Sequence, residues 1–291
     1  MMPQCTVSSR TVLLVALLLL PRPGVAAELK LATWNLEWLT DRPMGDRELP
    51  ADVHPKTPAD IDLLRHYASD LNADVIAIQE VDGAPVAARV FPPDVYSIHM
   101  SHDRVVQRVG VVVRRGIHYT VNPDVSGFEV DPGRELRSGV DITLNLAPSP
   151  LRILAVHLKT GCFDHRLEGG GPRACAELKR QVPALVDWIK ARKAEGVAFT
   201  VLGDFNRHMD GRDELWSTLQ RAAPLTRATE GHASPCWGGE AFIDHIILGG
   251  AAGDWLEADS LRVLTYRETG AEWKERLSDH CPVSVRLRLP G

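Results

Sequence analysis

The chain has 291 residues, a formal net charge of −5 at pH 7 and 24% charged residues. This mild acidity argues against a protein that coats nucleic acid through its overall charge, but it is compatible with an enzyme that has a local basic groove. With 44% hydrophobic residues and no internal repeat or low-complexity tract, the sequence predicts one domain with a large core.

The first 27 residues are typical of a secretory signal peptide. Residues 1–10 are polar with one cation, residues 11–20 are apolar, and residues 21–27 end in small side chains. The apolar block is shorter than the roughly 20 residues that cross a bilayer. We therefore expect cleavage after Ala27, a secreted or periplasmic protein, and a catalytic domain over residues 28–291. An uncleaved membrane anchor is the alternative.

The next segments predict a strand, a loop, a helix and a second strand. Residues 29–34 form an apolar strand, and residues 41–56, rich in Pro, Asp and Arg, form a surface loop. A helix starts after Thr57, because Thr57 is a good N-cap, Pro58 suits the first turn, and apolar residues recur at helical spacing up to Leu71. Residues 74–79 form a buried strand that ends at Glu80.

The rest of the chain is rich in predicted strands. They lie at residues 96–100, 109–113, 140–146, 151–158, 199–202, 241–248, 261–266 and 282–289. Helical spacing predicts helices at residues 174–194, bent near Pro183, and at residues 214–221. Many strands with a few interposed helices favour an α+β fold in which two packed sheets carry helices on the outside.

Four cysteines follow Ala27, and they predict two disulfides. An even number in an exported protein suggests pairing, and four cysteines allow three pairings. Cys162 and Cys175 flank the turn-rich residues 161–172, so we favour a bond between them, which leaves Cys236 to pair with Cys281. A thiolate metal site is the alternative, but no CxxC spacing supports it.

Polar side chains stand at six strand ends or in the adjoining loops. In chain order they are Asn35 with Glu37, Glu80, His157, Asp204 with Asn206, Asp244, and Asp279 with His280. Because alternate residues of a strand share a face, we expect two such residues two positions apart to point the same way. If the strands share an orientation at one rim, the groups converge. They would then supply oxygen ligands for a divalent ion, a base for water and donors for phosphoryl oxygens, which indicates metal-assisted hydrolysis of a phosphate ester.

Six short motifs also occur in a characteristic order. They lie at residues 33–37 (TWNLE), 78–81 (IQEV), 156–157 (VH), 203–206 (GDFN), 243–244 (ID) and 278–283 (SDHCPV). Together they resemble the endonuclease/exonuclease/phosphatase superfamily, which includes DNase I, apurinic endonucleases, neutral sphingomyelinases and inositol-polyphosphate 5-phosphatases. The resemblance covers nearly all of residues 28–291, and it implies that superfamily's four-layered α/β/β/α sandwich.

The resemblance implies a metal site for Mg²⁺ or Mn²⁺. Glu80 corresponds to the principal metal carboxylate, with Asn35 and Asp279 beside it. Glu37 matches an acid that assists metal binding in apurinic endonucleases, whereas DNase I has a basic residue there. The alternative for Glu80 is a solvated acid at the end of a strand.

The resemblance also implies a catalytic group. Asp204 would orient or deprotonate the attacking water, and Asn206 would bind the phosphate. His280 resembles the catalytic histidine, and Asp244 would fix its tautomer and stabilise its charged form. His157 would contact the phosphate or serve as the acid for the leaving group. A structural Asp–His pair and a core histidine are the alternatives.

Arg137 stands where DNase I has a phosphate-binding arginine, and a guanidinium suits phosphate. A surface arginine is the alternative. Around residues 105–108 the chain departs from DNase I, because the tyrosine and acid that support its histidines have no clear counterpart; Gln107 and Arg108 stand nearby. His245 follows Asp244 on the opposite face of its strand, so we interpret it as structural.

We expect an exported, monomeric, metal-dependent phosphodiesterase without stable membrane association. The simplest substrate is nucleic acid, as for a DNase I-like nuclease. A phosphomonoesterase or a sphingomyelinase-like phospholipid hydrolase on the same fold is the first alternative. A catalytically silent binding protein is the second.

Overall fold

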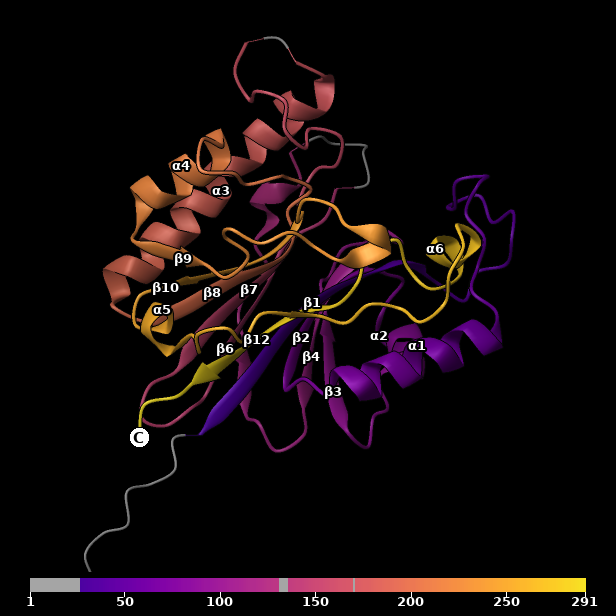
Figure 1. Cartoon of the computed structure of the whole chain (residues 1–291), viewed down its shortest axis with the longest axis horizontal. Coiled ribbons are helices and arrows are strands. Elements are labelled where there is room, and N and C mark those ends of the chain that lie inside the picture. The colour runs from indigo at the N-terminus through magenta and orange to yellow at the C-terminus, as the bar shows by residue number, and fades with distance from the viewer. Residues whose placement is uncertain (1–26, 131–135, 170) are drawn as a thin grey trace, which may run out of the picture.

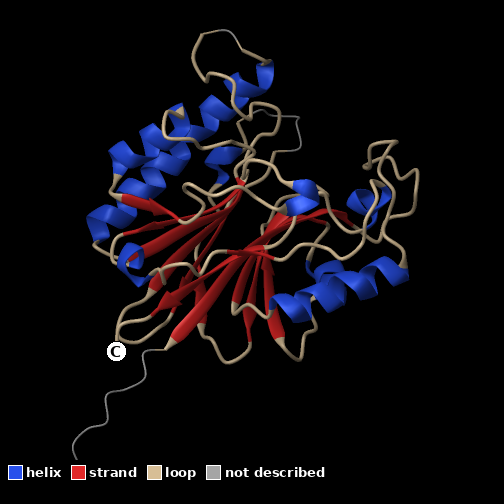
Figure 2. Ribbon diagram, viewed as in Figure 1, coloured by secondary structure: helices blue, strands red, loops and turns tan. Residues whose placement is uncertain are grey.

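The computed structural model describes residues 27–130, 136–169 and 171–291. All of the predicted signal peptide except Ala27 lies outside the described residues. Figures 1 and 2 show two β-sheets packed face to face, with helices on both outer sides. The predicted α+β fold and its four-layered α/β/β/α sandwich are confirmed.

The first sheet is built around the strand that follows Ala27. Its order is β11-β12-β1-β2-β4-β3. The strands are β1 (Glu28–Leu39), β2 (Val75–Val81), β3 (Tyr96–Met100), β4 (Arg108–Arg114), β11 (Arg262–Val263) and β12 (Val283–Arg288). β2 runs parallel to β1, whereas β12 runs antiparallel to it. Helices α1 (Pro58–Leu71) and α2 (Ala84–Val90) cover the outer face.

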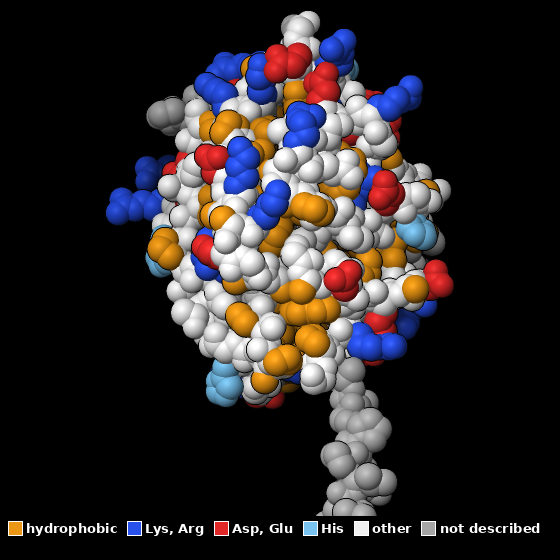
Figure 3. All heavy atoms as spheres, turned by 90° about the vertical axis from the view of Figure 1, so that its left-hand side faces the viewer, with side chains coloured by type: hydrophobic (Ala, Val, Ile, Leu, Met, Phe, Trp, Pro, Cys, Tyr) orange, Lys and Arg blue, Asp and Glu red, His pale blue; other side chains and the backbone are white. Residues whose placement is uncertain are grey.

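The second sheet has the order β5-β6-β7-β8-β10-β9. Its strands are β5 (Tyr119–Val121), β6 (Val140–Leu144), β7 (Leu151–His157), β8 (Ala198–Asp204), β9 (Leu225–Arg227) and β10 (Asp244–Gly249). Helices α3 (Arg173–Glu195) and α4 (Glu214–Ala222) pack on its outer face. Figure 3 views the molecule from that side, where charged and hydrophobic side chains are mixed. Two short helices, α5 (Ala252–Trp255) and α6 (Glu272–Arg276), lie in the connections.

The sequence alternation of β1 explains the layers. Leu31 lies in the core between the two sheets, whereas the next residue, Ala32, and Trp34 lie in the core beneath α1 and α2. Both faces of the strand are therefore buried, and apolar residues occupy both faces instead of one. The predicted start of α1 is confirmed by a capping box, because the side chains of Thr57 and Asp60 each accept a hydrogen bond from the other's backbone N–H.

Several predicted elements differ in extent. The predicted strand at residues 261–266 contributes only Arg262–Val263 to a strand, and Tyr266 instead turns toward Trp34, whose indole nitrogen donates to its hydroxyl. β10 begins at Asp244 rather than at residue 241. The sequence reading missed α2 and the three-residue strands β5 and β9, which are too short to show a period. Among the described helices, none is long and apolar enough to cross a membrane.

Both favoured disulfides are confirmed, Cys162–Cys175 and Cys236–Cys281. The first joins the connection after β7 to the start of α3. The second joins the connection before β10 to the residues that lead into β12. Each disulfide therefore restrains a loop next to a strand end that carries polar residues.

Gly203 allows β7 and β8 to meet closely beside the polar residues. Its φ is +148°, and a Cβ built there would lie 2.0 Å from the backbone oxygen of Val156. We predict that Gly203→Ala lowers the free energy of unfolding by about 2 kcal/mol or more, because neither backbone can move away. Thermal and urea unfolding measure this. Gly211→Ala is the matched control, because no atom lies within 4 Å of its Cβ position. Equal stability of both variants would contradict the prediction.

Candidate active site

The polar strand ends meet at one rim of the sandwich. β1, β2, β7 and β8 reach the rim with their carboxyl ends, whereas β10 and β12 start near it. The sheet register pairs Asp204 with His157 on one side and with Asp244 on the other. A pocket of about 570 Å³ opens at this rim. The predicted residues that line it are Glu80, Arg137, His157, Asp204, Asn206, Asp279 and His280.

Asn35 links the two sheets beneath the pocket. Its buried side-chain amide nitrogen donates to Glu80 Oε1 at 3.0 Å and to Asp204 Oδ2 at 3.1 Å. Its Oδ1 accepts the backbone N–H of Glu37 at 2.9 Å. The prediction of Asn35 as a metal ligand stays a prediction; in the structure its nitrogen faces the two acids and its Oδ1 accepts one hydrogen bond. Asn35 acts as a bridge between two carboxylates.

The two polar pairs converge through turns and not through strand alternation. Asn206 lies beyond β8, and its backbone N–H donates to Asp204 Oδ1 at 2.7 Å. The N–H of Glu37 donates to Asn35 Oδ1 in the same way. Asn206 and Glu37 both have left-handed backbones, with φ of 50° and 42°. The predicted convergence is therefore right, but the predicted reason is wrong, because a side-chain-to-backbone turn replaces the extended strand.

Glu80 is held in place by three donors. Besides Asn35, the backbone N–H of Trp38 and the side-chain amide of Gln107 donate to Glu80 Oε2. The backbone of Glu80 is left-handed, with φ of 61°, where the pairing between β2 and β4 shifts register. Strain of this kind, about 1–3 kcal/mol per residue, persists where the surroundings enforce it. The sequence reading noted Gln107 only as a departure from DNase I and assigned it no role.

Glu37 and Asp279 form an acidic pair next to Glu80. The Asp279 backbone N–H donates to Glu37 Oε2 at 3.2 Å. Burial, followed by the charge of Asp279, raises the pKa of Glu37 to about 8. Lys56 lies behind the pair, and its ammonium donates to the backbone oxygens of Glu37 at 2.8 Å and Glu275 at 3.0 Å. The loop at residues 41–56 was predicted to lie on the surface, but Lys56 is buried.

Asp204 is a fully buried carboxyl at the floor of the pocket. Burial raises its pKa to about 7, while His280 lowers the pKa and Asp244 raises it. The side-chain amide of Asn206 donates to Asp204 Oδ2 at 3.0 Å, and the ring of His157 lies 3.5 Å away. A carboxyl with a pKa near neutrality can exchange a proton at physiological pH, which is what a general base requires.

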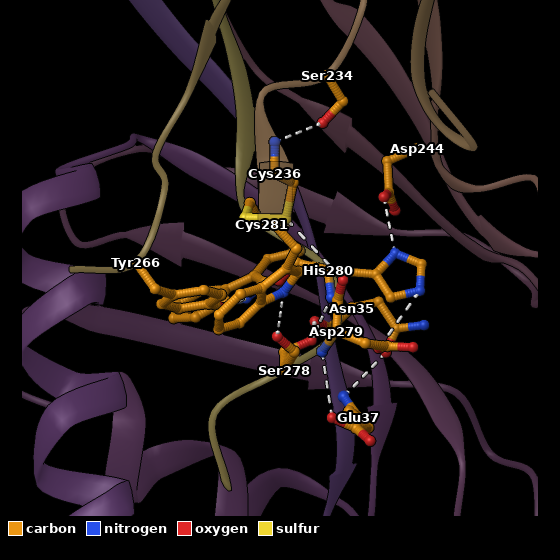
Figure 4. The surroundings of a disulfide bond; sticks show 12 residues. Asn35, Glu37, Ser234, Cys236, Asp244, Tyr266, Ser278, Asp279, His280 and Cys281 are labelled. Atoms are coloured by element: carbon orange, nitrogen blue, oxygen red, sulfur yellow. Dashed lines mark hydrogen bonds and ion pairs between the residues drawn. A yellow bond between two sulfur atoms is a disulfide. The ribbon is translucent and has the colours of Figure 1, made fainter. Parts of the chain in front are cut away.

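His280 is held by an acid, a neighbouring disulfide and a tyrosine, and nearby acids favour its charged form. Burial lowers its pKa, but Asp244 and Asp204 outweigh burial and raise the pKa well above the ordinary value. Its Nδ1 lies 2.7 Å from Asp244 Oδ2, so the predicted pair is present. The next residue, Cys281, carries the disulfide to Cys236, and Figure 4 shows this disulfide beside the histidine. The hydroxyl of Tyr266 donates to the backbone oxygen of His280 at 2.9 Å.

Arg137 and His157 form the opposite wall. Nη2 of Arg137 lies 2.7 and 2.8 Å from the two ring nitrogens of His157, so the guanidinium covers the ring. Burial and this cation lower the pKa of His157 well below its ordinary value. A neutral imidazole can still donate one N–H to a phosphate oxygen. Arg137 is buried and is not the surface arginine of the alternative.

His245 has the structural role that we predicted. It is buried on the far face of β10, where Nδ1 lies 2.6 Å from the Thr229 hydroxyl and Nε2 lies 2.9 Å from the backbone oxygen of Arg207. Burial lowers its pKa to about 3. It therefore stays neutral and takes no part in the pocket.

Comparison with protein families decides the classification. The model described as the endonuclease/exonuclease/phosphatase family matches residues 32–280. The chain belongs to this family. Its members hydrolyse phosphate esters and typically use divalent metal ions. A search of curated protein sequences finds no match.

Solved structures of the family share the fold. TDP2 from Caenorhabditis elegans has a TM-score of 0.57 at 15% identity, over 90% of this chain and 74% of that one. The 3′ phosphatase NExo from Neisseria, bound to a product DNA hairpin, has a TM-score of 0.55 at 16% identity, over 89% and 99% of the two chains. Danio rerio TDP2 with a single-strand DNA product has a TM-score of 0.57 at 14% identity, over 89% and 98%. At these identities the likeness shows the fold alone.

Two acidic groups at the rim could hold the divalent ion of the family. Asp204, Asp244 and His280 place one ligand atom each within 4.8 Å of one another. Asp244 and Asp204 raise the pKa of His280, so a metal ion bound here would have to displace a proton that the two carboxylates stabilise.

The second group, Glu37, Glu80 and Asp279, consists of the predicted metal carboxylates, but among the described residues only the first group brings three ligand atoms within 4.8 Å of one another. All three residues of the second group offer carboxylate oxygens, the ligands that Mg²⁺ and Mn²⁺ prefer. Asp279 and Glu80 both raise the pKa of Glu37, so their charges repel one another when no cation is bound. A divalent ion bound here would relieve that repulsion.

Metal binding should therefore release a proton. Because Glu37, with a pKa of about 8, must lose its proton to bind metal, we predict that Mn²⁺ affinity falls as the pH drops from 8 to 6, by up to about tenfold per pH unit. Isothermal titration calorimetry in buffers of different ionisation enthalpy measures the Mn²⁺ affinity and the number of protons released.

Glu37→Gln should bind Mn²⁺ more weakly at pH 8 and lose most of the pH dependence. Glu257→Gln is the control, because Glu257 pairs with Arg288 at the far end of β12. An affinity that does not change between pH 6 and 8 in the unmodified protein would exclude Glu37 from the metal group.

Proposed function

We propose that the protein is an exported, metal-dependent phosphodiesterase that hydrolyses nucleic acid. The contact of one Asn35 amide nitrogen with both Glu80 and Asp204 carries the proposal. It joins the metal-side carboxylate and the water-side carboxylate through hydrogen bonds to the same nitrogen. A single phosphate in the pocket can therefore meet both.

Glu37, Glu80 and Asp279 would hold the metal ion. When bound, the ion would neutralise charge that develops on the phosphoryl and leaving oxygens. The three donors to Glu80 fix the direction of that carboxylate before any ion binds. Lys56 anchors the backbone of Glu37 in the same way.

On the water side, Asp204 would take a proton from the attacking water. The hydrogen bonds from Asn206 and Asn35 orient the carboxylate, and its raised pKa makes it a stronger base than an exposed aspartate. The water oxygen forms the new bond to phosphorus, and the bond to the leaving oxygen breaks on the opposite side.

His280 is placed to hold a non-bridging oxygen. Its Nε2 lies 3.8 Å from Asp204 Oδ2, so the histidine stands beside the attacking water. In-line displacement puts the leaving oxygen on the far side of phosphorus, out of its reach. Arg137 and His157 supply further donors for the phosphate. The side-chain nitrogen of Asn206, in contrast, donates to Asp204 and to the backbone oxygen of Leu158.

Nucleic acid is the substrate that the remaining observations support best. The Neisseria enzyme is bound to a DNA hairpin and the Danio rerio protein to single-strand DNA, both as products. Two disulfides are typical of proteins in oxidising compartments, which supports export. Extracellular nucleic acid is the substrate class available to such an enzyme.

Purified protein should cleave plasmid DNA with Mg²⁺ or Mn²⁺ and lose this activity in EDTA. We predict that Glu80→Ala lowers the rate by roughly a hundredfold or more, because it removes a metal carboxylate. Asp204→Asn should lower kcat by about 10²–10⁴-fold through loss of the base. Glu257→Ala is the control for both. Metal-independent cleavage, or full activity of both variants, would sink the proposal.

A substrate panel tests the alternatives. Hydrolysis of inositol phosphates or sphingomyelin without cleavage of DNA or RNA would replace nucleic acid by a phosphomonoester or a phospholipid. No metal-dependent hydrolysis of any member of the panel would favour a binding protein.

The activity should have a bell-shaped pH dependence. Asp204 must lose a proton, so the rate rises with pH around 7; His280 must keep one, so the rate falls at a pH well above its ordinary pKa. Asp244 raises both pKa values, so Asp244→Asn should move both limbs to lower pH and reduce the maximum. Profiles of kcat/KM at saturating Mg²⁺ measure the shift. If both limbs of the kcat/KM profile stay at the same pH in Asp244→Asn, Asp204 and His280 are not the groups that set them.

A further inference from the structure

Phe163 is an exposed aromatic ring at the rim of the active-site pocket. It is 36% exposed, and among the described residues only three other large hydrophobic side chains are comparably exposed. It lines the same pocket as Asp204 and Asn206. We infer that Phe163 is the stacking platform for a nucleobase next to the scissile phosphate. This inference rests on the proposed function and names the part of the substrate that the site recognises.

The backbone of Phe163 is fixed to the catalytic segment. An isolated parallel bridge pairs Phe163 with Arg207, directly after Asn206. The N–H of His208 donates to the backbone oxygen of Phe163 at 3.0 Å. The neighbouring Cys162 is bonded to Cys175 at the start of α3. The ring is therefore held at a set distance from the residues that would bind the phosphate.

Arg207 adds further hydrogen bonds to the loop that carries Phe163. Its buried guanidinium donates to the backbone oxygens of Cys162 at 2.9 Å and His165 at 2.6 Å, on the two sides of Phe163. It also donates to Asp213 Oδ2 at 2.7 Å. The buried ion pair and the disulfide both restrain the backbone on either side of Phe163. The position of this exposed residue relative to the pocket is therefore fixed.

The ring itself is supported on one side. The imidazole of His208 stacks on Phe163, with ring centroids 5.8 Å apart and an angle of 28° between the planes. The rest of the phenyl ring stays exposed at the pocket. A planar group that enters beside the phosphate can continue this stack, as bases do on aromatic side chains of proteins that bind single strands.

Stacking on an aromatic ring distinguishes between different phosphate esters. A nucleobase offers a flat π-surface, and an inositol ring does not. Because every base has such a surface, stacking on Phe163 would favour nucleic acid with little dependence on sequence. Lys159 and Thr160 line the same pocket and could contact the polynucleotide backbone. A choline head group is the competing occupant, since a quaternary ammonium also binds an aromatic face.

The test compares two single-stranded oligonucleotides. One carries bases throughout, and the other has abasic tetrahydrofuran units on both sides of the phosphate to be cleaved. We expect Phe163→Ala to raise KM for the first by about tenfold or more with little change in kcat, because a stacking contact is made equally before and during the reaction. For the second, KM should already be high in the unmodified protein and should not rise further in the variant.

Two more variants separate stacking from bulk and from misfolding. Phe163→Trp keeps a π-surface and should retain the original KM, whereas Phe163→Leu keeps only apolar bulk and should behave like Phe163→Ala. Each variant should unfold within a few degrees of the parent protein. An unchanged KM in Phe163→Ala, or a normal KM in Phe163→Leu, would overturn the inference. So would loss of sphingomyelin hydrolysis in Phe163→Ala while oligonucleotide cleavage persists.

Failure of this inference is distinguishable from failure of the proposed function. If the unmodified protein cleaves oligonucleotides but Phe163→Ala has no effect, only the stacking platform is wrong. If the unmodified protein cleaves no oligonucleotide in the presence of Mg²⁺ or Mn²⁺, both are wrong.

Discussion

The site depends on one buried amide group at the contact between the two sheets. The side chain of Asn35 comes from the first sheet and uses both amide hydrogens on carboxylates, one on Glu80 in its own sheet and one on Asp204 in the other. Bonds to ionised acceptors are among the stronger hydrogen bonds in proteins, and leaving a buried carboxylate unpaired is costly. The spacing of the two acids, and with it the width of the catalytic pocket, therefore follows from how the sheets pack at this one side chain.

The same kind of side-chain-to-backbone turn shapes the rim on both sheets. In each, a side-chain oxygen accepts the backbone N–H two residues later, and that later residue adopts a left-handed backbone. Glu37 and Asn206 are the two residues so turned, and Glu80 has a similar backbone at the end of the neighbouring strand. A regular strand would have carried these side chains away along the sheet. The turn at Asn206 follows the end of β8, and the turn at Glu37 makes a bulge in β1, which then continues to Leu39. Both direct polar groups into one space, at the cost of local strain.

The sequence alone predicts the layers and the core of the site, because both are encoded locally. Apolar runs with turn residues between them mark the long strands, and the polar group at each strand end marks the rim. What it could not predict depends on contacts between distant segments. Gln107 and Lys56 acquire their roles only when folding brings them to Glu80 and Glu37, and no spacing signals this. In the sequence, nothing distinguishes Phe163 from other loop residues. Only the bridge to Arg207 places it beside the pocket. The alternation rule failed at Glu37 and Asn206, since it assumes an extended backbone.

The pairing of β1 with β12 has a consequence for when the site can exist. β1 is the first described strand and β12 the last, yet they lie side by side near the centre of one sheet, from Glu28 against Arg288 to Thr33 against Val283. Asp279 and His280 reach the rim only because the chain then enters β12. During synthesis, a chain that still lacks its last strand has Asn35, Glu80 and Asp204 but neither the histidine nor the acid beside it. Completion of the pocket therefore depends on contacts of very large sequence separation, which pair the first described strand with the last.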